Sequence, residues 1–367
     1  MPSESLFARR FDAAALRAPC AAVLFSAVAC GIPTSVPDSP IIDLRWVVPS
    51  QSARFTVDNL LPSGVTIIVP DSSGFTIAAA AAAVTRTLSQ DCNACVALNG
   101  LNAPKPAFLA NASAGTSLPT DIAAATLVSG SLQVVVQNNY TFDPLRPNPT
   151  VGSPNGYAVI TVSNGNNVIG RDSVNGATTP LPAGTTLTRT IPVSGAVSGT
   201  QPLTVAMVLN SPAGENRFID ASKTITVTAT PSGLKVANVS VNVVNKKVNS
   251  STTIDLAGVD SSITNHVQGG SLIVALVNPF TVAGNLTMNL TPSGGGLTIT
   301  KTIALAAGNS TPPPIPFTKD ELRSLLGHTV AVTYTGKMNS ATPVNVSPKQ
   351  VVVVTTKLDL NLTLGGS

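Results

Sequence analysis

The feature that most constrains this chain is an internal repeat in its C-terminal part. Residues 131–140 (SLQVVVQNNY) resemble residues 271–280 (SLIVALVNPF). Residues 181–193 resemble residues 305–317, because Leu-x-Ala-Gly is followed at the same spacing by Ile-Pro in both. Self-similarity of this kind indicates that one structural unit has been duplicated and that its copies share a fold.

Two further blocks extend the repeat in the same order along the chain. Residues 203–208 (LTVAMV) match 328–333 (HTVAVT), and residues 222–228 (SKTITVT) match 348–354 (PKQVVVV). A common order of all the blocks argues against coincidence. We therefore expect two domains of one fold, at residues 118–245 and 246–367.

Both copies carry the pattern of antiparallel β-structure. Residues 358–364 (LDLNLTL) alternate strictly between leucine and polar residues, and residues 239–243 (VSVNV) alternate in the same way. A period of two places the apolar side chains on one face of a strand. Turn-forming residues separate the runs, as at 163–167 and 292–296. The predicted fold class is all-β, with tandem antiparallel β-sandwich domains of the immunoglobulin or fibronectin kind.

The segment before the repeat, residues 46–117, is expected to form a β-rich domain of its own. It holds strand-like runs such as 64–69 (GVTIIV) and the only tryptophan, Trp46, which we expect to anchor a core. Six alanines at 78–83 predict a short helix, because alanine has the highest helix propensity.

The clearest helix is predicted in the second copy, at residues 318–326 (TKDELRSLL). Thr318 suits the N-cap position, and Glu321 completes a capping box with it. Gly327 supplies the stop.

The first 29 residues have the features of an export signal. Arg9, Arg10 and Arg17 give a positive start, and residues 18–29 form an apolar run. A run of about 12 residues is too short to span a bilayer, which takes about 20. The last three residues, Ala-Val-Ala, fit the small-x-small pattern of an ordinary signal-peptide cleavage site.

The same three residues followed by Cys30 also resemble a bacterial lipobox, in which the cysteine is lipidated and becomes the new N-terminus. We favour this interpretation over simple cleavage, because a Pro/Ser-rich tether over residues 30–45 follows the cysteine. Multiple acyl chains would anchor the protein stably. Gly31, rather than an aspartate, follows Cys30, so the expected destination is the outer membrane or cell surface.

Cys92 and Cys95 are the only other cysteines outside the leader, and their C-x-x-C spacing has three interpretations. A zinc site would need two more ligands, and the histidines lie far along the chain. A thioredoxin-like redox motif occurs in a βαβ unit, which the flanking residues do not indicate. The interpretation we favour is a small-loop disulfide formed in an oxidising compartment.

The composition argues against catalysis. Charged residues are 10% of the chain, against about 25% in ordinary soluble domains. General acid–base work needs paired carboxylates or a placed histidine, yet the chain has only His266 and His328, and Glu321 already caps a helix. We expect no enzyme activity, no cofactor and no metal. The scattered basic residues, with a net charge of +4, also argue against nucleic-acid binding.

The repeat resembles the late-embryogenesis-abundant group 2 proteins and their water-stress-and-hypersensitive-response domain. A strand that ends in Asn-Pro-Tyr/Asn/Phe marks that family, and Asn278, Pro279 and Phe280 match it. The first copy has a degraded version without the proline, formed by Asn138, Asn139 and Tyr140. The resemblance implies a β-sandwich and a non-catalytic role that is stress-protective or membrane-associated.

Together these features predict a lipid-anchored or secreted cell-surface protein with a structural, binding or stress-protective role. The lipid anchor would make the membrane one partner, and proteins or glycans at the cell surface are the other partners we expect. One alternative is an adhesin or carbohydrate-binding module. Another is a subunit of a surface layer or filament, which would self-associate through edge strands.

Overall fold

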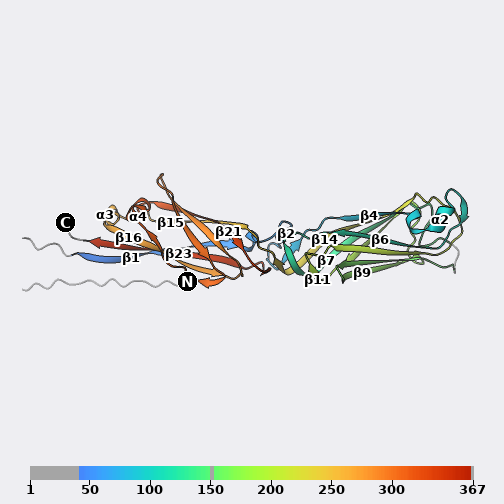
Figure 1. The fold of residues 1–367 in the computed structure, drawn as a ribbon, viewed down its shortest axis with the longest axis horizontal. Coiled ribbons are helices and arrows are strands. Elements are labelled where there is room, and N and C mark those ends of the chain that lie inside the picture. Colours follow the sequence, from blue (N-terminus) through green and yellow to red (C-terminus); the bar gives the residue numbers. More distant parts are fainter. Residues whose placement is uncertain (1–40, 149–152, 365–367) are drawn as a thin grey trace, which may run out of the picture. The chain divides into compact units, whose positions relative to one another are not determined.

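The computed structural model describes residues 41–148 and 153–364, and each repeat copy supplies most strands of one sandwich of two antiparallel sheets (Figure 1). The predicted fold class is confirmed. In the first sandwich one sheet is built on the long strands β7 (Ile122–Asn138) and β14 (Thr224–Val241), which pair with each other. Shorter strands flank them: β4 (Ala82–Thr87), β10 (Thr186–Pro192) and β11 (Gly195–Ser198). The facing sheet has the order β6 (Phe108–Thr116), β12 (Leu203–Ser211), β8 (Tyr157–Asn164) and β9 (Asn167–Asn175).

The second sandwich repeats this plan. Its first sheet has the order β1 (Ile42–Thr56), β23 (Val351–Leu364) and β16 (Val267–Asn278), and β16 also pairs with β19 (Gly308–Ser310) and β20 (Ile315–Phe317). The facing sheet has the order β15 (Lys246–Asp255), β21 (Thr329–Asn339), β17 (Ala283–Pro292) and β18 (Ile299–Leu305).

The strand register shows how closely the two copies agree. Ile191 of β10 lies opposite Leu132 of β7, and Ile315 of β20 lies opposite Leu272 of β16. The matching Ile-Pro blocks of the sequence therefore occupy the same place against the same strand in each sandwich.

Residues 46–117 do not form a separate sheet system. Strand β1 pairs along its length with β23, about 300 residues away, and its Phe55 is buried in the second sandwich. Strands β4 and β6 belong instead to the first sandwich. The expected N-terminal domain is thus shared between the two sandwiches, because an antiparallel strand pair needs matching edges and not nearness in sequence.

Small elements complete the chain. The connection after β1 contains a 3-10 turn (Val57–Asn59) and two short strands, β2 (Val65–Ile67) and β3 (Phe75–Ile77), which pair with each other. Strand β5 (Asn102–Pro104) pairs with β13 (Asn216–Phe218), and β22 (Val344–Val346) pairs with the end of β14. The helices are α1 (Leu88–Asp91), α2 (Asn93–Ala97), α3 (Ser261–His266) and α4 (Lys319–Leu325).

The helix predicted over the alanine run 78–83 is wrong. Ala82 and Ala83 begin β4, where Ala82 lies opposite Ala229 of β14. Pairing with a long central strand overrides the weak intrinsic preference of alanine for helix. The helices of this region, α1 and α2, begin only after that strand ends.

The helix predicted at 318–326 is present as α4. The Thr318 hydroxyl accepts a hydrogen bond from the Glu321 N–H at 3.2 Å, and the Glu321 carboxylate accepts one from the Thr318 N–H at 2.9 Å. Gly327 then turns the chain with a φ of +82°, a conformation that favours glycine. The capping residues therefore set both ends of the helix.

The core follows the alternation seen in the sequence. Leu358, Leu360 and Leu362 of β23 are buried in the second sandwich, and Val239 and Val241 of β14 are buried in the first. Trp46 is only partly buried and packs against the core. No helix among residues 41–148 and 153–364 is long and apolar enough to cross a membrane.

Candidate functional site

The Asn-Asn-Tyr motif of the first copy lies at the end of β7. Asn138 is fully buried, and its Nδ2 donates hydrogen bonds to the carbonyl oxygens of Phe142 at 2.9 Å and Leu181 at 2.8 Å. Its Oδ1 accepts a hydrogen bond from the Tyr140 N–H at 2.9 Å. The neighbouring Asn139 reaches only the Thr224 hydroxyl, at 3.2 Å. Asn138 therefore satisfies backbone groups that would otherwise be buried without partners.

The Asn-Pro-Phe motif of the second copy has the same arrangement at the end of β16. The buried Asn278 donates to the carbonyl oxygens of Val282 at 2.9 Å and Ala306 at 2.7 Å, and accepts from the Phe280 N–H at 3.1 Å. Pro279 between them is exposed. In both copies the motif thus holds a chain reversal, and its first asparagine is buried and hydrogen-bonded to the backbone.

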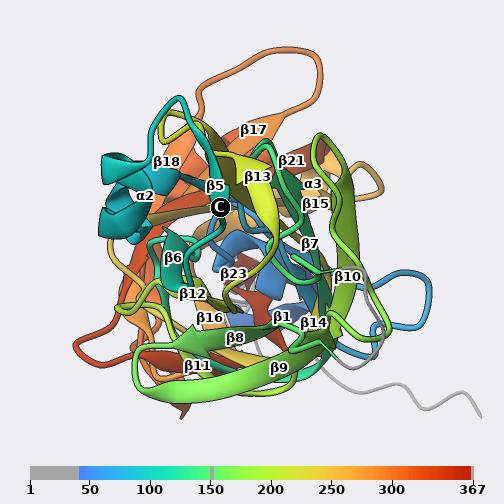
Figure 2. The same cartoon turned by 90° about the vertical axis from the view of Figure 1, so that its right-hand side faces the viewer.

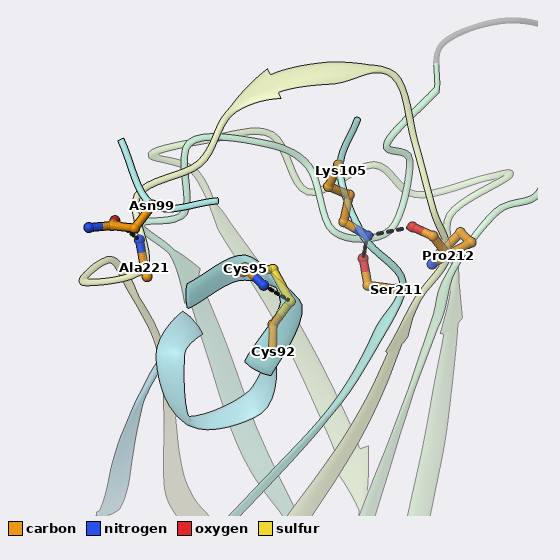
Figure 3. The surroundings of a disulfide bond; sticks show 7 residues. All are labelled: Cys92, Cys95, Asn99, Lys105, Ser211, Pro212 and Ala221. Atoms are coloured by element: carbon orange, nitrogen blue, oxygen red, sulfur yellow. Dashed lines mark hydrogen bonds between the residues drawn. A yellow bond between two sulfur atoms is a disulfide. The ribbon is translucent and has the colours of Figure 1, made fainter. Parts of the chain in front are cut away.

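The cysteine pair lies in a segment that covers one end of the first sandwich (Figures 1 and 2). We call this segment, residues 88–104, the cap. Cys92 and Cys95 form a disulfide with their Cα atoms 5.2 Å apart, and both side chains are buried. Cys92 also caps α2, because its sulfur accepts a hydrogen bond from the Cys95 N–H at 3.1 Å (Figure 3). The cap is held to the sandwich by Asn99, whose Oδ1 accepts from the Ala221 N–H at 2.9 Å.

A buried lysine that the sequence did not single out lies beside this cap. Lys105 is 1% exposed, and its ammonium donates to the Ser211 hydroxyl and the Pro212 carbonyl oxygen (Figure 3). It also lies over the rings of Phe108 and Phe142, 4.7 and 5.5 Å from their centroids. Burial lowers the pKa of Lys105 to about 7, and the nearby negative charge of Asp143 opposes part of that change.

A partly buried ion pair also lies at the capped end of the first sandwich. Arg86 of β4 contacts Asp91 of α1 at 2.7 Å, and the Asp91 side chain is 3% exposed. Burial raises the pKa of Tyr140, and the charge of Asp91 adds to that increase. The second Asp91 oxygen, the Arg86 Nε and the Tyr140 hydroxyl have no hydrogen-bond partner among the described residues. Arg86 and Asp91 hold α1 against β4, and the tyrosine stays neutral over the physiological pH range.

A second polar region lies on the outer face of the sheet formed by β15, β21, β17 and β18. The strand register places Lys247, Lys337 and Asn285 in one row across three strands. The next row contains Asn249, Thr335, Thr287 and Thr302. These rows border an open hollow of about 620 Å³, which Asn245 and Asn339 also line. The hollow offers ammonium, amide and hydroxyl groups to solvent without an aromatic side chain.

The other titratable residues considered in the sequence do not gather into a catalytic cluster. His266 ends α3 and is hydrogen-bonded through Nδ1 to the Ser262 carbonyl oxygen. Glu321 pairs with Lys301 at 2.8 Å in addition to its capping bond. Within the described part of the chain, no group of three or more His, Cys, Asp or Glu side chains could hold a metal ion. Cys30 and residues 31–40 of the expected tether lie outside the described residues, whereas residues 42–45, also assigned to the tether, form the start of strand β1 because they pair with β23.

Comparison with known proteins gives structural neighbours of low sequence identity. No protein-family model and no curated protein matches the chain. A protein of Parabacteroides distasonis ATCC 8503 that carries the provisional name of a secreted protein is 10% identical, with 86% of this chain and 99% of that chain covered and a TM-score of 0.32. A tandem carbohydrate-binding-module pair (CBM22-1 and CBM22-2) of Paenibacillus barcinonensis Xyn10C is 8% identical, with 78% and 98% covered and a TM-score of 0.15. A structure of infectious bursal disease virus, strain Gx, is 12% identical, with 91% and 83% covered and a TM-score of 0.17. These values are too low to indicate a shared function.

Proposed function

We propose that this chain is an exported surface protein, anchored by lipid on Cys30, whose two β-sandwiches have a binding, structural or stress-protective role without catalysis. The observation that carries the proposal is the Cys92–Cys95 disulfide in the cap of the first sandwich. Disulfides form and persist in oxidising compartments outside the cytosol. That location agrees with an export leader ending at residue 29.

The first and last strands support an anchored role. Ile42 lies opposite Leu364, and from there β1 and β23 pair in register to Val48 and Leu358. A pulling force on a tether that enters at Ile42 would therefore act along the length of an extended antiparallel strand pair. Such a pair distributes a pulling force over many hydrogen bonds, which suits a protein held at a surface.

The alternative role as a carbohydrate-binding module or adhesin is favoured by one specific observation. The hollow on the outer face of the second sandwich is lined by hydroxyl, amide and ammonium groups, which are the groups that bind sugars and their charged substituents. A stress-protective role of the late-embryogenesis-abundant kind rests on the Asn-Pro-Phe resemblance. The two roles are compatible with the same anchor.

The anchor is tested by metabolic labelling with an alkyne fatty acid in a bacterial host. The wild-type protein and a Cys20→Ser variant should incorporate the label and fractionate with membranes, whereas Cys30→Ala should remain unlabelled. Cys20 is a matched control because it lies in the same leader but before the expected cleavage site. Label on the Cys30→Ala protein, or a mature N-terminus other than residue 30, would overturn the lipid anchor. An unlabelled but exported wild-type protein would leave a secreted protein cleaved by ordinary signal peptidase.

A further inference from the structure

The hollow beside β15 and β21 contains a charge arrangement that its own sheet does not neutralise. Lys247 lies directly opposite Lys337 on the neighbouring strand, and both side chains are exposed on the same face. Like charges placed directly opposite each other in a sheet destabilise the strand pair. Neither lysine has an ion pair within the part of the chain that the structure describes.

Nearby lysines on other faces are neutralised. Lys246, adjacent to Lys247, contacts Asp121 at 2.7 Å, and Lys301 of β18 contacts Glu321 at 2.8 Å. The pair in the hollow instead faces amides and hydroxyls, which can bind a ligand but do not cancel charge. The positive charges of Lys247 and Lys337 are therefore not balanced by the described side chains that line the hollow.

The floor of the hollow is fixed by close backbone contact. A Cβ atom on Gly336 would lie 2.4 Å from the Asn285 carbonyl oxygen, and one on Gly284 would lie 2.1 Å from the Lys337 carbonyl oxygen. Strands β17 and β21 thus approach closely at two glycines, where no side chain stands. The polar groups around this floor are set by the sheet and not by a mobile loop.

The spacing of the rows suits a sugar ligand. Lys247, Lys337 and Asn285 form one row, and the next row along the same strands lies two residues away, about 7 Å. One row supplies the two ammonium groups and an amide, and the next supplies Asn249 with threonine hydroxyls. An anionic substituent at the first row would leave the ring hydroxyls of the same sugar near the second.

We propose that this hollow binds an acidic sugar, with the anionic group held between Lys247 and Lys337 and the hydroxyls held by Asn249, Asn285 and Thr335. The anion could be the carboxylate of a uronic acid or the phosphate of a phosphorylated surface glycan, because both present charged oxygens to an ammonium group. The proposal deepens the sugar-binding alternative above and requires no lipid anchor. It can therefore be tested on the unlipidated Cys30→Ala protein.

Isothermal titration calorimetry on that protein tests the site with hexagalacturonic acid, glucose 6-phosphate and the neutral maltohexaose. Binding of hexagalacturonic acid alone assigns the uronate source, and binding of glucose 6-phosphate alone assigns the phosphorylated source. The K247Q/K337Q double variant should lose at least about tenfold in affinity, as expected for charge-assisted hydrogen bonds. Its thermal stability should be equal to or above that of the parent, because a like-charge pair is removed.

The matched control is K235Q/K357Q, which removes two exposed lysines outside the hollow and changes the net charge equally. Its affinity should change by less than about twofold. Equal weakening in both double variants would show binding by net charge only and would overturn the site. Failure of both acidic ligands to bind at millimolar concentration, or equal binding of maltohexaose, would overturn it as well. None of these outcomes bears on the labelling of Cys30.

Discussion

The two sandwiches share a strand plan but differ at the end where β6 and β15 begin. Lysines at that end are buried in one sandwich and exposed in the other. In the first, Lys105 precedes β6, and its ammonium is buried beside Ser211, the last residue of β12. In the second, Lys247 lies near the start of β15 and Lys337 near the end of β21, and both are exposed. The first sandwich buries its cation beside the cap, whereas the second presents two cations to solvent.

The difference lies in what surrounds the framework and not in the framework itself. Asn138 and Asn278 make equivalent hydrogen bonds at the same strand ends, and Ile191 and Ile315 occupy equivalent registers. The first sandwich adds the disulfide-containing cap, residues 88–104, before β6. A repeated core therefore leaves its ends free to acquire different surfaces, which is where binding residues are commonly placed.

The largest expected effect concerns the origin of β1. A fragment of residues 246–367 should fail to fold cooperatively, because it lacks strand β1, which pairs with β23 and contributes the buried Phe55. Joining residues 42–61 to 243–364 through a short Gly/Ser linker should restore a β-rich circular dichroism spectrum and a cooperative urea transition. Cooperative folding of 246–367 with the stability of the joined chain would mean that β1 is dispensable.

The buried asparagines give the next largest effect. Asn278→Ala leaves two carbonyl groups and one N–H group without partners, and should lower the free energy of unfolding by about 3 kcal/mol or more. Asn138→Ala should do the same in the first sandwich. Asn139→Ala is the control, since its amide makes one long hydrogen bond at 3.2 Å and should cost less than about 1 kcal/mol. Equal losses at Asn138 and Asn139 in urea titrations would refute this division of roles.

Local patterns in the sequence predicted the elements that depend on neighbouring residues. The capping box at Thr318 and Glu321 and the alternation of 358–364 both specify structure within a few residues, and both are observed. The match of 222–228 with 348–354 was less accurate. By the register, Ile225 lies opposite Asn138, while Val353 lies opposite Val277, so Ile225 corresponds to Val352 and not to Val351. Four consecutive valines show no alternation, and a one-residue error exchanges the two faces of a strand.

Features that depend on distant pairing could not be predicted from the sequence. The place of β1 in the second sandwich requires its pairing with β23 across the whole chain. The Lys247–Lys337 pair appears only when the register of β15 and β21 is known. Lys105 stands between two prolines in the sequence, without a pattern that indicates burial. Its partners, Ser211 and Phe142, are brought to it by the fold.

The buried cation of the first sandwich should make its stability depend on pH. Burial lowers the pKa of Lys105 to about 7 from its ordinary value of 10.5, so above pH 7 the unfolded chain binds more protons at this residue than the folded one. The free energy of unfolding should therefore rise between pH 6.5 and 8.5, by up to about 2 kcal/mol from this group. Lys105→Met, which keeps the length of the side chain, should remove that rise in urea titrations at the two pH values. A rise of the same size in Lys105→Met would assign the pH dependence to other groups. The control is Lys357→Met, at an exposed lysine of the second sandwich, which should retain the pH dependence of the parent protein.

The smallest expected effect is that of removing the disulfide. This change tests whether the cysteine pair of the cap has a structural or a chemical role. The loop closed by Cys92 and Cys95 is very short, so chain entropy assigns the bond less than about 2 kcal/mol. Cys92→Ala with Cys95→Ala should therefore leave the protein exported and folded, with the melting temperature lowered by only a few degrees. The cap remains attached through Asn99 and Ala221 and through the Arg86–Asp91 pair, none of which the double variant removes. Mass spectrometry of the wild-type protein should find the cysteines oxidised and free of metal. Stoichiometric zinc, or a thiol-oxidoreductase activity that disappears in the double variant, would replace the structural role with a chemical one and would remove the disulfide as support for a non-catalytic surface protein.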